Sequence, residues 1–377
     1  MSAVSVLAGI SSPVLRGVLI GAIMMLVGGP PTLRYVVRPE LERYGLETAR
    51  MDRFTSMTVG AALVGAVLAA SALAVSTVEA SGVGSLVGWA SATPDGRTWL
   101  ALVAVAGFLG VLTAGRRFLS PRHWLDAVCV GGLGMLLAFC WTRYSIAVDS
   151  EAVAIVAKFG HMTGAALWVG GLAVLAAFPA LLGSEPDEAT VAPLIRSIIR
   201  RFSMIAVAGV TVAFATGIVI AAWHVPTLSA LVSTPYGLLL SAKVGLVSLA
   251  AAIGGFNRVV VHERIATSAD EPRSTAAIPG LLAVAKPRIA PSDAVSAVTR
   301  SVRLELAVLV VAIALSVVLT TMTPSYELFG ATVAASGRLA VGAAIGFATL
   351  LKTSAVAIAL VGSLALGYEL GASDLVG

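Results

Sequence analysis

Residues 303–324 read RLELAVLVVAIALSVVLTTMTP, and the run of Leu, Val, Ile and Ala between Glu305 and Thr320 decides the fold class. A helix that crosses a bilayer needs about 20 predominantly apolar residues, and this stretch supplies them. A strand of a membrane barrel would instead show about 10 residues in which apolar and polar side chains alternate, and this stretch has no such alternation. The stretch is therefore predicted to be a membrane-spanning α-helix.

The rest of the chain consists largely of similar stretches. Hydrophobic residues make up 58% of the 377 residues and charged residues only 12%, against about 25% in a typical soluble protein. Short charged or proline-containing connections separate apolar stretches that lie roughly at residues 12–37, 56–78, 98–115, 123–143, 152–182, 203–224, 236–260, 303–324 and 338–367. The sequence predicts an all-α, polytopic transmembrane helix bundle of about nine spans, with eight or ten spans as alternatives.

The positions of the basic residues predict the orientation of the bundle. Most of the 25 Lys and Arg residues fall in the connections between spans 1 and 2, 3 and 4, 5 and 6, and 7 and 8. The alternate connections contain only Arg97, Arg143 and Arg338. By the positive-inside rule, the basic connections face the cytoplasm and the N-terminus lies outside a cell (cytoplasmic) membrane. The net charge of +5 is then an orientation signal that also contacts anionic lipid headgroups, and no nucleic-acid partner is expected.

The ends of the chain and its longest connection carry further expectations. The first residues lack a positively charged region before an apolar one, so no cleaved signal peptide is expected. Residues 261–302 are rich in Pro, Ser, Ala and mixed charges and are expected to form a cytoplasmic loop. The last apolar stretch contains Lys352 and is either one tilted helix or two re-entrant pieces. No nucleotide-binding, hydrolase or zinc-protease motif is present, so neither an enzyme nor an ATP-driven pump is expected.

Ionisable side chains inside predicted spans are candidate functional residues, because each costs several kcal/mol in hydrocarbon unless it is paired or wetted. They are Arg16, Lys158, His161, Lys243, Glu305 and Lys352. Lys243 either has a functional role or reaches the outer surface with its flexible side chain. For Glu305, a buried ion pair with a basic residue such as Arg258 is favoured over a role in proton transfer.

His161 is the histidine predicted to lie deepest in the membrane, about 13 Å below the outer edge of its span. Trp168, Gly164 and Gly171 follow it at helical spacing in HMTGAALWVGG, so they share one stripe. Small residues on such a stripe let a neighbouring helix approach closely. His161 is therefore either part of an internal site or a hydrogen-bonded packing residue.

Soft ligand atoms fall at the same outer level of the predicted bundle. Imidazole, thiolate and thioether groups select copper(I) over hard cations, and the residues that carry them are Cys140, Met162, His161, His224 and Met322. No two of them have a tight chelate spacing, and a methionine in a span is more often part of the core. Lys158, one turn from His161, argues against a simple cation site unless its ammonium group reaches outward or loses its proton.

Five segments together resemble the successive helices of the copper resistance protein D (CopD) family. They are HMTGAALWVGGL (161–172), RFSMIAVAGVTVAFATGI (201–218), STPYGLLLSAKVGLV (233–247), FNR (256–258) and RLELAVLVVAIALSVVLTTMTP (303–324). The resemblance divides the chain into a four-helix membrane region (1–150), a CopD-like membrane domain (151–325) and a C-terminal membrane segment (326–377). Family-pattern positions that the resemblance carries are His161, Trp168, Gly170, Gly171, Pro235, Tyr236, Gly237, Lys243, Asn257, Arg258 and Glu305.

The resemblance implies a copper-handling inner-membrane protein, linked to copper uptake and resistance, that works with a small extracytoplasmic copper-binding protein. The expected function is a copper permease, with the copper ion as transported substrate. The main alternative is a membrane cytochrome in which His161 pairs with His224, and His123 with His262, around two b-type haems. A third is a sensor or scaffold that binds a cytoplasmic partner through residues 261–302.

Overall fold

The computed structural model describes residues 3–81, 85–141, 150–182, 187–258, 289 and 291–325, together with 354, 355 and 358. Within these ranges, eight helices are long and apolar enough to cross a membrane. They are α1 (Ala3–Thr32), α3 (Ala49–Ser81), α5 (Pro94–Ala114), α6 (Pro121–Cys140), α7 (Glu151–Ala176), α9 (Glu188–His224), α11 (Pro235–Phe256) and α13 (Pro291–Leu319).

The structure confirms the predicted all-α, polytopic fold class. The first eight predicted spans each correspond to one of the long helices, whereas the ninth, 338–367, lies outside the described residues apart from Ser354, Ala355 and Ile358. Helix α13 begins at Pro291, so residues 291–302, which the sequence placed in a loop, are helical. A proline and Asp293 in the first turn favour a helix start at this point, and the low hydropathy of the segment concealed it.

Short elements complete the chain between the long helices. A five-residue π-helical turn, η1 (Leu33–Val37), and α2 (Arg38–Arg43) continue α1. The others are α4 (Leu86–Ala92), the 3₁₀ turn η2 (Arg116–Phe118), α8 (Phe178–Leu181) and α10 (Leu228–Ser233). One residue separates Pro30 and Pro31 from η1, and prolines lack the N–H that a regular helix needs, which accounts for the irregular turn.

Three of the long helices begin with the same local signal, a hydroxyl residue followed by proline. Thr93, Ser120 and Thr234 precede α5, α6 and α11, and each side-chain oxygen accepts a hydrogen bond from a backbone N–H in the first turn. Proline fits the first helical position because its missing N–H would have no partner there. These caps define where the chain re-enters the membrane.

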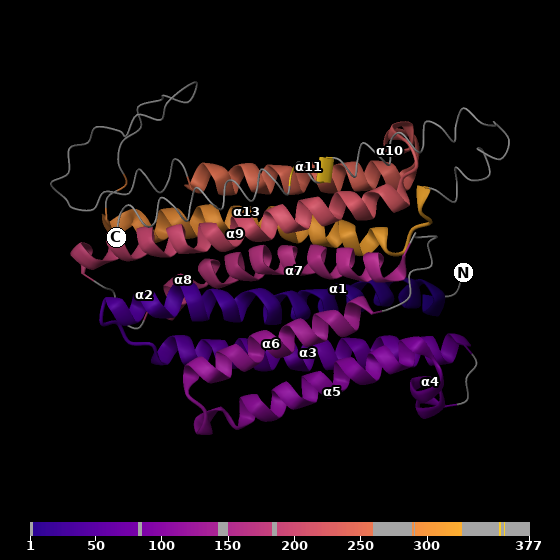
Figure 1. Ribbon diagram of the computed structural model, residues 1–377, viewed down its shortest axis with the longest axis horizontal. Helices are drawn as coiled ribbons and strands as arrows, with labels where there is room; N and C mark the ends of the chain where they lie inside the picture. Colours follow the sequence, from indigo (N-terminus) through magenta and orange to yellow (C-terminus); the bar gives the residue numbers. More distant parts are fainter. Residues whose placement is uncertain are drawn as a thin grey trace.

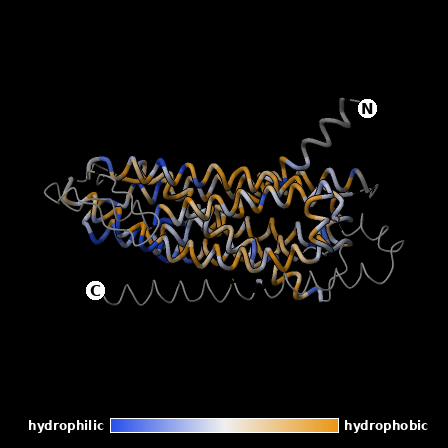
Figure 2. Tube along the Cα trace, turned by 90° about the horizontal axis from the view of Figure 1, so that it is seen from above, coloured by the Kyte–Doolittle hydropathy of each residue, from blue (hydrophilic) through white to orange (hydrophobic). Residues whose placement is uncertain are grey.

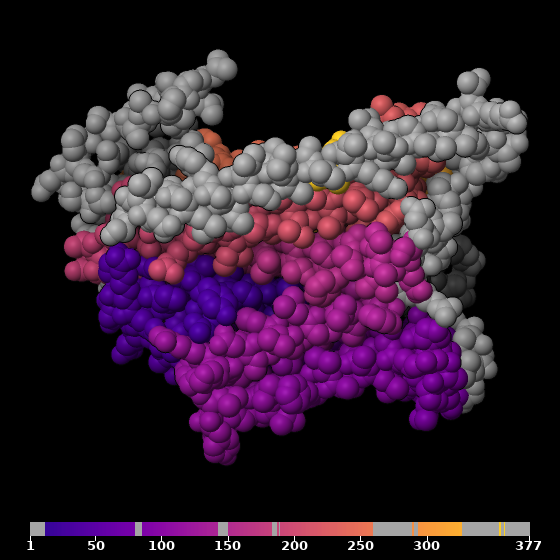
Figure 3. All heavy atoms as spheres, in the orientation of Figure 1, coloured from indigo at the N-terminus to yellow at the C-terminus, as the bar shows by residue number. Residues whose placement is uncertain are grey.

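The long helices lie side by side in alternating directions, with α1 in the middle of the bundle (Figure 1). Helix α1 packs against α3 and α6 on one side and against α7 on the other, and α7 in turn packs against α9 and α13. Helix α11 lies on α13. The N-terminal helices thus fill one side of the molecule and α9, α11 and α13 the other, with the chain order visible in Figure 3.

Hydrophilic residues gather most densely at one end of the bundle (Figure 2). We call the end that carries α2, η2 and α8 the basic end. Five ion pairs lie there among the described residues: Arg34–Asp126, Arg38–Glu42, Arg38–Asp52, Arg122–Glu42 and Arg201–Glu40. The predicted orientation makes this end cytoplasmic.

Candidate functional site

His161 lies at the interface between α7 and α9. Its Nδ1 is 2.7 Å from the carbonyl oxygen of Ala213 on α9. Gly217 follows Ala213 by one turn, and a Cβ at Gly217 would lie 3.0 Å from the imidazole. Because Gly217 has no side chain, the imidazole of His161 fits against α9. Sequence reasoning did not identify Ala213 or Gly217, because which face of α9 meets α7 is decided by packing.

The small residues near His161 do let α9 approach, as the sequence predicted. A Cβ at Gly164 would collide with the backbone of Gly209 and Ala213, and one at Gly171 would collide with Phe202. The stripe of His161, Gly164 and Gly171 thus faces α9. Trp168 turns instead towards α13.

The hydrogen bond to Ala213 determines which nitrogen of His161 can bind a ligand. A carbonyl oxygen only accepts, so Nδ1 carries the proton and donates it. In a neutral imidazole, Nε2 then holds the free lone pair. Metal-binding histidines commonly have this second-shell bond to a backbone carbonyl, because it fixes the ring and makes the other nitrogen more basic.

His224 closes α9 at the opposite end from the basic one and has the same arrangement. Its Nδ1 lies 2.8 Å from the carbonyl oxygen of Ile220 one turn earlier, so its Nε2 also holds the lone pair. The ring stacks on Tyr236, with centroids 5.9 Å apart and planes 4° from parallel. Tyr236 is buried in the first turn of α11, behind the Thr234 cap. Two elements therefore hold this imidazole in place.

Lys243 of α11 is close enough to both imidazoles for its charge to act on His161 and His224. The two histidines therefore share one electrostatic environment in the part of the bundle away from the basic end. Sequence reasoning predicted Lys243 as a pathway residue or as a side chain that reaches the surface. The structure places it in α11, about two turns along the helix from the Tyr236 ring on which His224 stacks.

The predicted sulfur ligands are distributed over three places. Met322 packs in the small apolar cluster that contains Tyr236, next to the ring on which His224 stacks. Met162 packs against the main core. Cys140 is buried at the end of α6, within the electrostatic reach of Lys158, whose ammonium lies over the ring of Phe139 at 5.2 Å from the centroid. Of the three, Met322 is the one that packs against the cluster containing the ring on which His224 stacks.

A ready-made metal centre is not found in the described part of the chain, where no three His, Cys, Asp or Glu side chains form a group that could hold a metal ion. The described residues contribute two imidazoles, a thioether packed against the cluster that contains Tyr236, and a lysine whose charge acts on both imidazoles. Such a set can hold a soft ion with few ligands at successive positions, rather than trap it in a closed cage.

A second polar cluster joins α7, α11 and α13 nearer the basic end. The indole nitrogen of Trp168 donates to Oε1 of Glu305 at 2.8 Å, and the amide nitrogen of Asn257 donates to Oε2 at 3.4 Å. The hydroxyl of Ser301 donates to the amide oxygen of Asn257. Trp168 and Glu305 are 4% and 3% exposed. We call these four residues the Glu305 cluster.

The Glu305 cluster differs from what the sequence suggested. The sequence favours an ion pair with a basic residue such as Arg258, whereas the hydrogen-bond partners of the carboxylate among the described residues are an indole and an amide. Arg303 points away and donates to the carbonyl oxygen of Ala176 at 3.2 and 3.3 Å. Ser301 was not singled out in the sequence, since nothing marks a serine in a polar helix end as part of a buried network.

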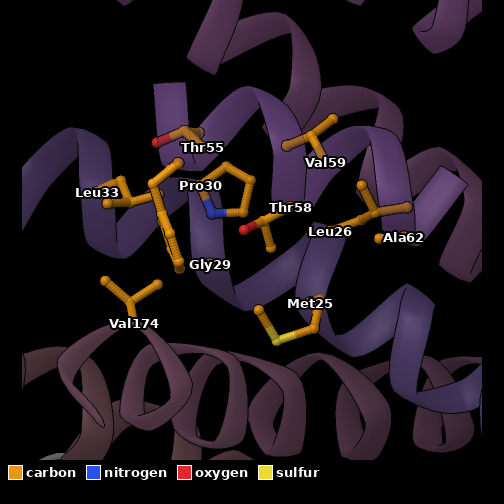
Figure 4. A pocket seen from close by; sticks show the side chains of 11 residues that line it. Met25, Leu26, Gly29, Pro30, Leu33, Thr55, Thr58, Val59, Ala62 and Val174 are labelled. Carbon is orange, nitrogen blue, oxygen red and sulfur yellow. The ribbon is translucent and has the colours of Figure 1, made fainter. Parts of the chain in front are cut away.

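A small crevice between α1, α3 and α7 is the remaining candidate (Figure 4). Its lining is mostly apolar, with Met25, Pro30, Val59 and Val174 around the hydroxyl groups of Thr55 and Thr58. The Thr55 hydroxyl already donates to the carbonyl oxygen of Met51 at 2.6 Å. One thioether without an imidazole or carboxylate does not make a metal site.

Comparison with known proteins places the candidate site in a recognisable region. Residues 196–319 match the family model described as Copper resistance protein D. The copper transport protein CutJ of Bacillus subtilis (strain 168) is 30% identical to this chain over 176 residues, which are 46% of this chain and 32% of that protein. The match thus spans about a third of the relative's length. No solved structure matches the chain.

The matched region contains α11, α13 and most of α9, and with them His224, Lys243, Asn257 and Glu305. His161 and Trp168 come from α7, which packs directly against α9 and α13. Residues 196–319 of this polytopic helical chain are therefore similar to the copper resistance protein D family.

Proposed function

We propose that the protein is a permease that moves copper ions across the cytoplasmic membrane. The observation that carries the proposal is the pair of imidazoles, His161 and His224, each of which donates its Nδ1–H to a backbone carbonyl and keeps Nε2 for a soft ion. The family match and the name of the CutJ relative point to copper as that ion.

The two histidines lie at successive depths along α9. His161 contacts the helix at Ala213 and Gly217, and His224 follows Gly217 by seven residues, or about 10 Å of helix rise. Copper(I) would bind first at His224 with the nearby Met322 and then at His161. Binding by few ligands at each step favours passage, because an ion must be able to leave each position.

Lys243 fits a role in setting how strongly the ion is held. Its charge acts on both imidazoles, so a cation bound there meets repulsion that shortens its stay. Met162 and Cys140 belong to the packing around this path in the proposal rather than to its ligands, because each lies in the core or beside Lys158. Asn257, Arg258 and Glu305 lie nearer the basic end, where the ion would exit.

The direction and partner follow from the predicted orientation. If the basic end is cytoplasmic, His224 and Met322 face the outer side, where a small copper-binding protein would deliver the ion. Helix α10, whose Leu228 and Val232 side chains are exposed, and the stacked His224–Tyr236 pair lie at this entry.

The test replaces each imidazole by an amide that keeps hydrogen bonding but is a poor ligand for copper(I). His161→Gln and His224→Gln are each expected to reduce copper-dependent accumulation in cells by on the order of tenfold or more, as loss of one ligand bond of about 1.4 kcal/mol or more implies. His161→Ala should abolish accumulation. Metal content of cells, normalised to the amount of folded protein in the membrane, is the measurement.

His123→Gln is the matched control. His123 is exposed at the basic end and bonds to the Ser120 hydroxyl at 2.8 Å, away from the other two histidines. Its replacement should leave accumulation unchanged. Full accumulation in His161→Gln would refute its role as a ligand and leave it as a packing residue. A strong Soret band in the visible spectrum of the purified protein would instead favour the cytochrome alternative.

A further inference from the structure

The described part of the chain contains two buried glutamates in opposite environments. Glu40 is 0% exposed and forms an ion pair with Arg201 at 2.5 Å. Glu305 is 3% exposed, and its hydrogen-bond partners are the neutral groups of Trp168 and Asn257. The first carboxylate has its counter-ion, and the second has none in an ion pair among the described residues.

Among the described residues, none of the charged groups near Glu305 forms an ion pair with it. From α7 it meets Trp168, while His161 lies about 10 Å further along the same helix. From α11 it meets Asn257, next to Arg258, and Lys243 lies about 20 Å away along that helix.

The other helices that pack against α13, namely α9, α1 and α8, also supply no ion-pair partner for Glu305 among the described residues. Arg201 of α9 is paired with Glu40, and Arg16 of α1 reaches the Thr320 hydroxyl at the far end of α13. On α13 itself, Arg303 bonds to the carbonyl of Ala176 and Arg300 is exposed. Helix α8 carries no titratable residue.

This environment suits a proton better than a metal ion. An ionised carboxylate in a membrane protein is costly without a counter-ion, and a bound proton removes that cost. Two N–H donors point at the oxygens of Glu305, so the ionised form is also supported, and the group can exist in both forms. A metal cation would be repelled by the same N–H groups, and a soft copper(I) ion does not prefer oxygen ligands.

The location allows exchange with water at the basic end. Ser301 and Asn257 are partly exposed, and Ser301 lies one helical turn nearer that end than Glu305. A Cβ at Gly254 would collide with Oε1 of Glu305, so the absence of a side chain there is what admits the carboxylate between α11 and α13. The packing of α11 against α13 thus leaves space for the carboxylate of Glu305.

We propose that Glu305 binds and releases one proton in each transport cycle, and that copper at His161 drives the release. The step is the simple equilibrium of a carboxylate and a proton from water with the neutral carboxylic acid. A positive charge at His161, about 10 Å from Trp168 along α7, favours the ionised form by on the order of tenfold. This proposal rests on the proposed copper transport function.

The direct test is infrared spectroscopy of the whole protein reconstituted in lipid vesicles, titrated with pH in the absence of copper. The wild type should show a carbonyl band of a protonated carboxyl group that disappears as pH rises. Glu305→Gln should lack this band, and Glu40→Gln, in which the replaced carboxylate had an arginine partner, should keep it. If the band persists in Glu305→Gln, the proposal is wrong.

Trp168→Phe keeps the ring packing and removes one donor to the carboxylate. It should move the midpoint of the same infrared titration to higher pH, because the ionised form loses a hydrogen bond, while a purely structural role would leave the midpoint in place. This variant also keeps the test open if Glu305→Gln does not fold. An unchanged midpoint in folded Trp168→Phe would overturn the assignment.

The coupling is tested by copper uptake into the vesicles with and without an imposed pH gradient. Wild-type uptake should respond to the gradient, whereas Glu305→Gln should exchange copper at equal pH but lose the response. An equal response in both proteins, or a wild-type response to sodium that the variant loses, would refute proton coupling. If the wild type neither binds nor moves copper, the proposed function and the coupling fail together, and the infrared result alone decides whether Glu305 binds a proton.

Discussion

At the scale of single residues, the candidate site depends on glycines as much as on functional side chains. His161 fits against α9 because Gly217 has no Cβ, and Glu305 fits against α11 because Gly254 has none. In both cases a glycine on one helix receives a functional group from another. Replacing an exposed glycine inside a helix by alanine normally raises stability by about 0.5–1 kcal/mol. A loss on the same replacement at one of these positions would therefore show that the contact needs a residue without a side chain.

Gly217→Ala is predicted to disturb His161. The new Cβ would lie 3.0 Å from both Nδ1 and Cε1 of the imidazole, so the ring must shift and its bond to Ala213 weakens. We expect copper affinity of the purified protein to fall by on the order of tenfold. Gly245→Ala on α11 is the control, since no atom lies within 4 Å of its new Cβ. Equal affinities in the two variants would show that the position of this ring does not matter.

At the scale of elements, the crossing of α1 and α7 connects the N-terminal helices to α9 and α13, which lie largely in the region that matches the Copper resistance protein D model. A Cβ at Gly28 would overlap the carbonyl of Ala166, and one at Gly170 would overlap the backbone of Gly28 and Met24. The two helix backbones therefore touch, as in other membrane crossings built on small residues. Helix α7, which carries His161 and Trp168, is thus held from one side by α1 and from the other by α9 and α13.

Gly28→Ala is predicted to lower the stability of the protein by about 2 kcal/mol or more, because a methyl group cannot enter between two backbones without moving a helix. Gly21→Ala on the same helix α1 has no atom within 4 Å of its new Cβ, and it should be neutral or slightly stabilising. Thermal unfolding of both variants in the same detergent measures the difference. A Gly28→Ala protein as stable as the Gly21→Ala protein would contradict this close crossing.

At the scale of the whole molecule, hydropathy alone predicts the spans because about 20 apolar residues are required for each crossing. It does not predict contacts between helices. No pattern in the sequence indicates that Trp168 turns from the stripe of His161 to α13, or that Glu305 meets an amide in place of an arginine. Such contacts depend on how each helix is rotated, and in a bundle where nearly every face is apolar no pattern fixes that rotation.

The orientation of the bundle is the property on which the direction of transport depends. The ion pairs of α2, α6 and α9 all lie at the basic end, which the positive-inside rule assigns to the cytoplasm. Glu47 and Leu119 are exposed in connections at this end, and Val87 and Ser229 are exposed at the other. Single cysteines at these four positions would therefore report the orientation.

In a background without Cys129 and Cys140, a membrane-impermeant thiol reagent applied to intact cells should label cysteines at Val87 and Ser229. Cysteines at Glu47 and Leu119 should react only after the membrane is permeabilised. Replacing Cys129 and Cys140 breaks no disulfide bond, because both thiols are free. The opposite labelling pattern would place His224 on the cytoplasmic side, and the proposed sequence of copper binding, His224 before His161, would then describe export of copper rather than its entry.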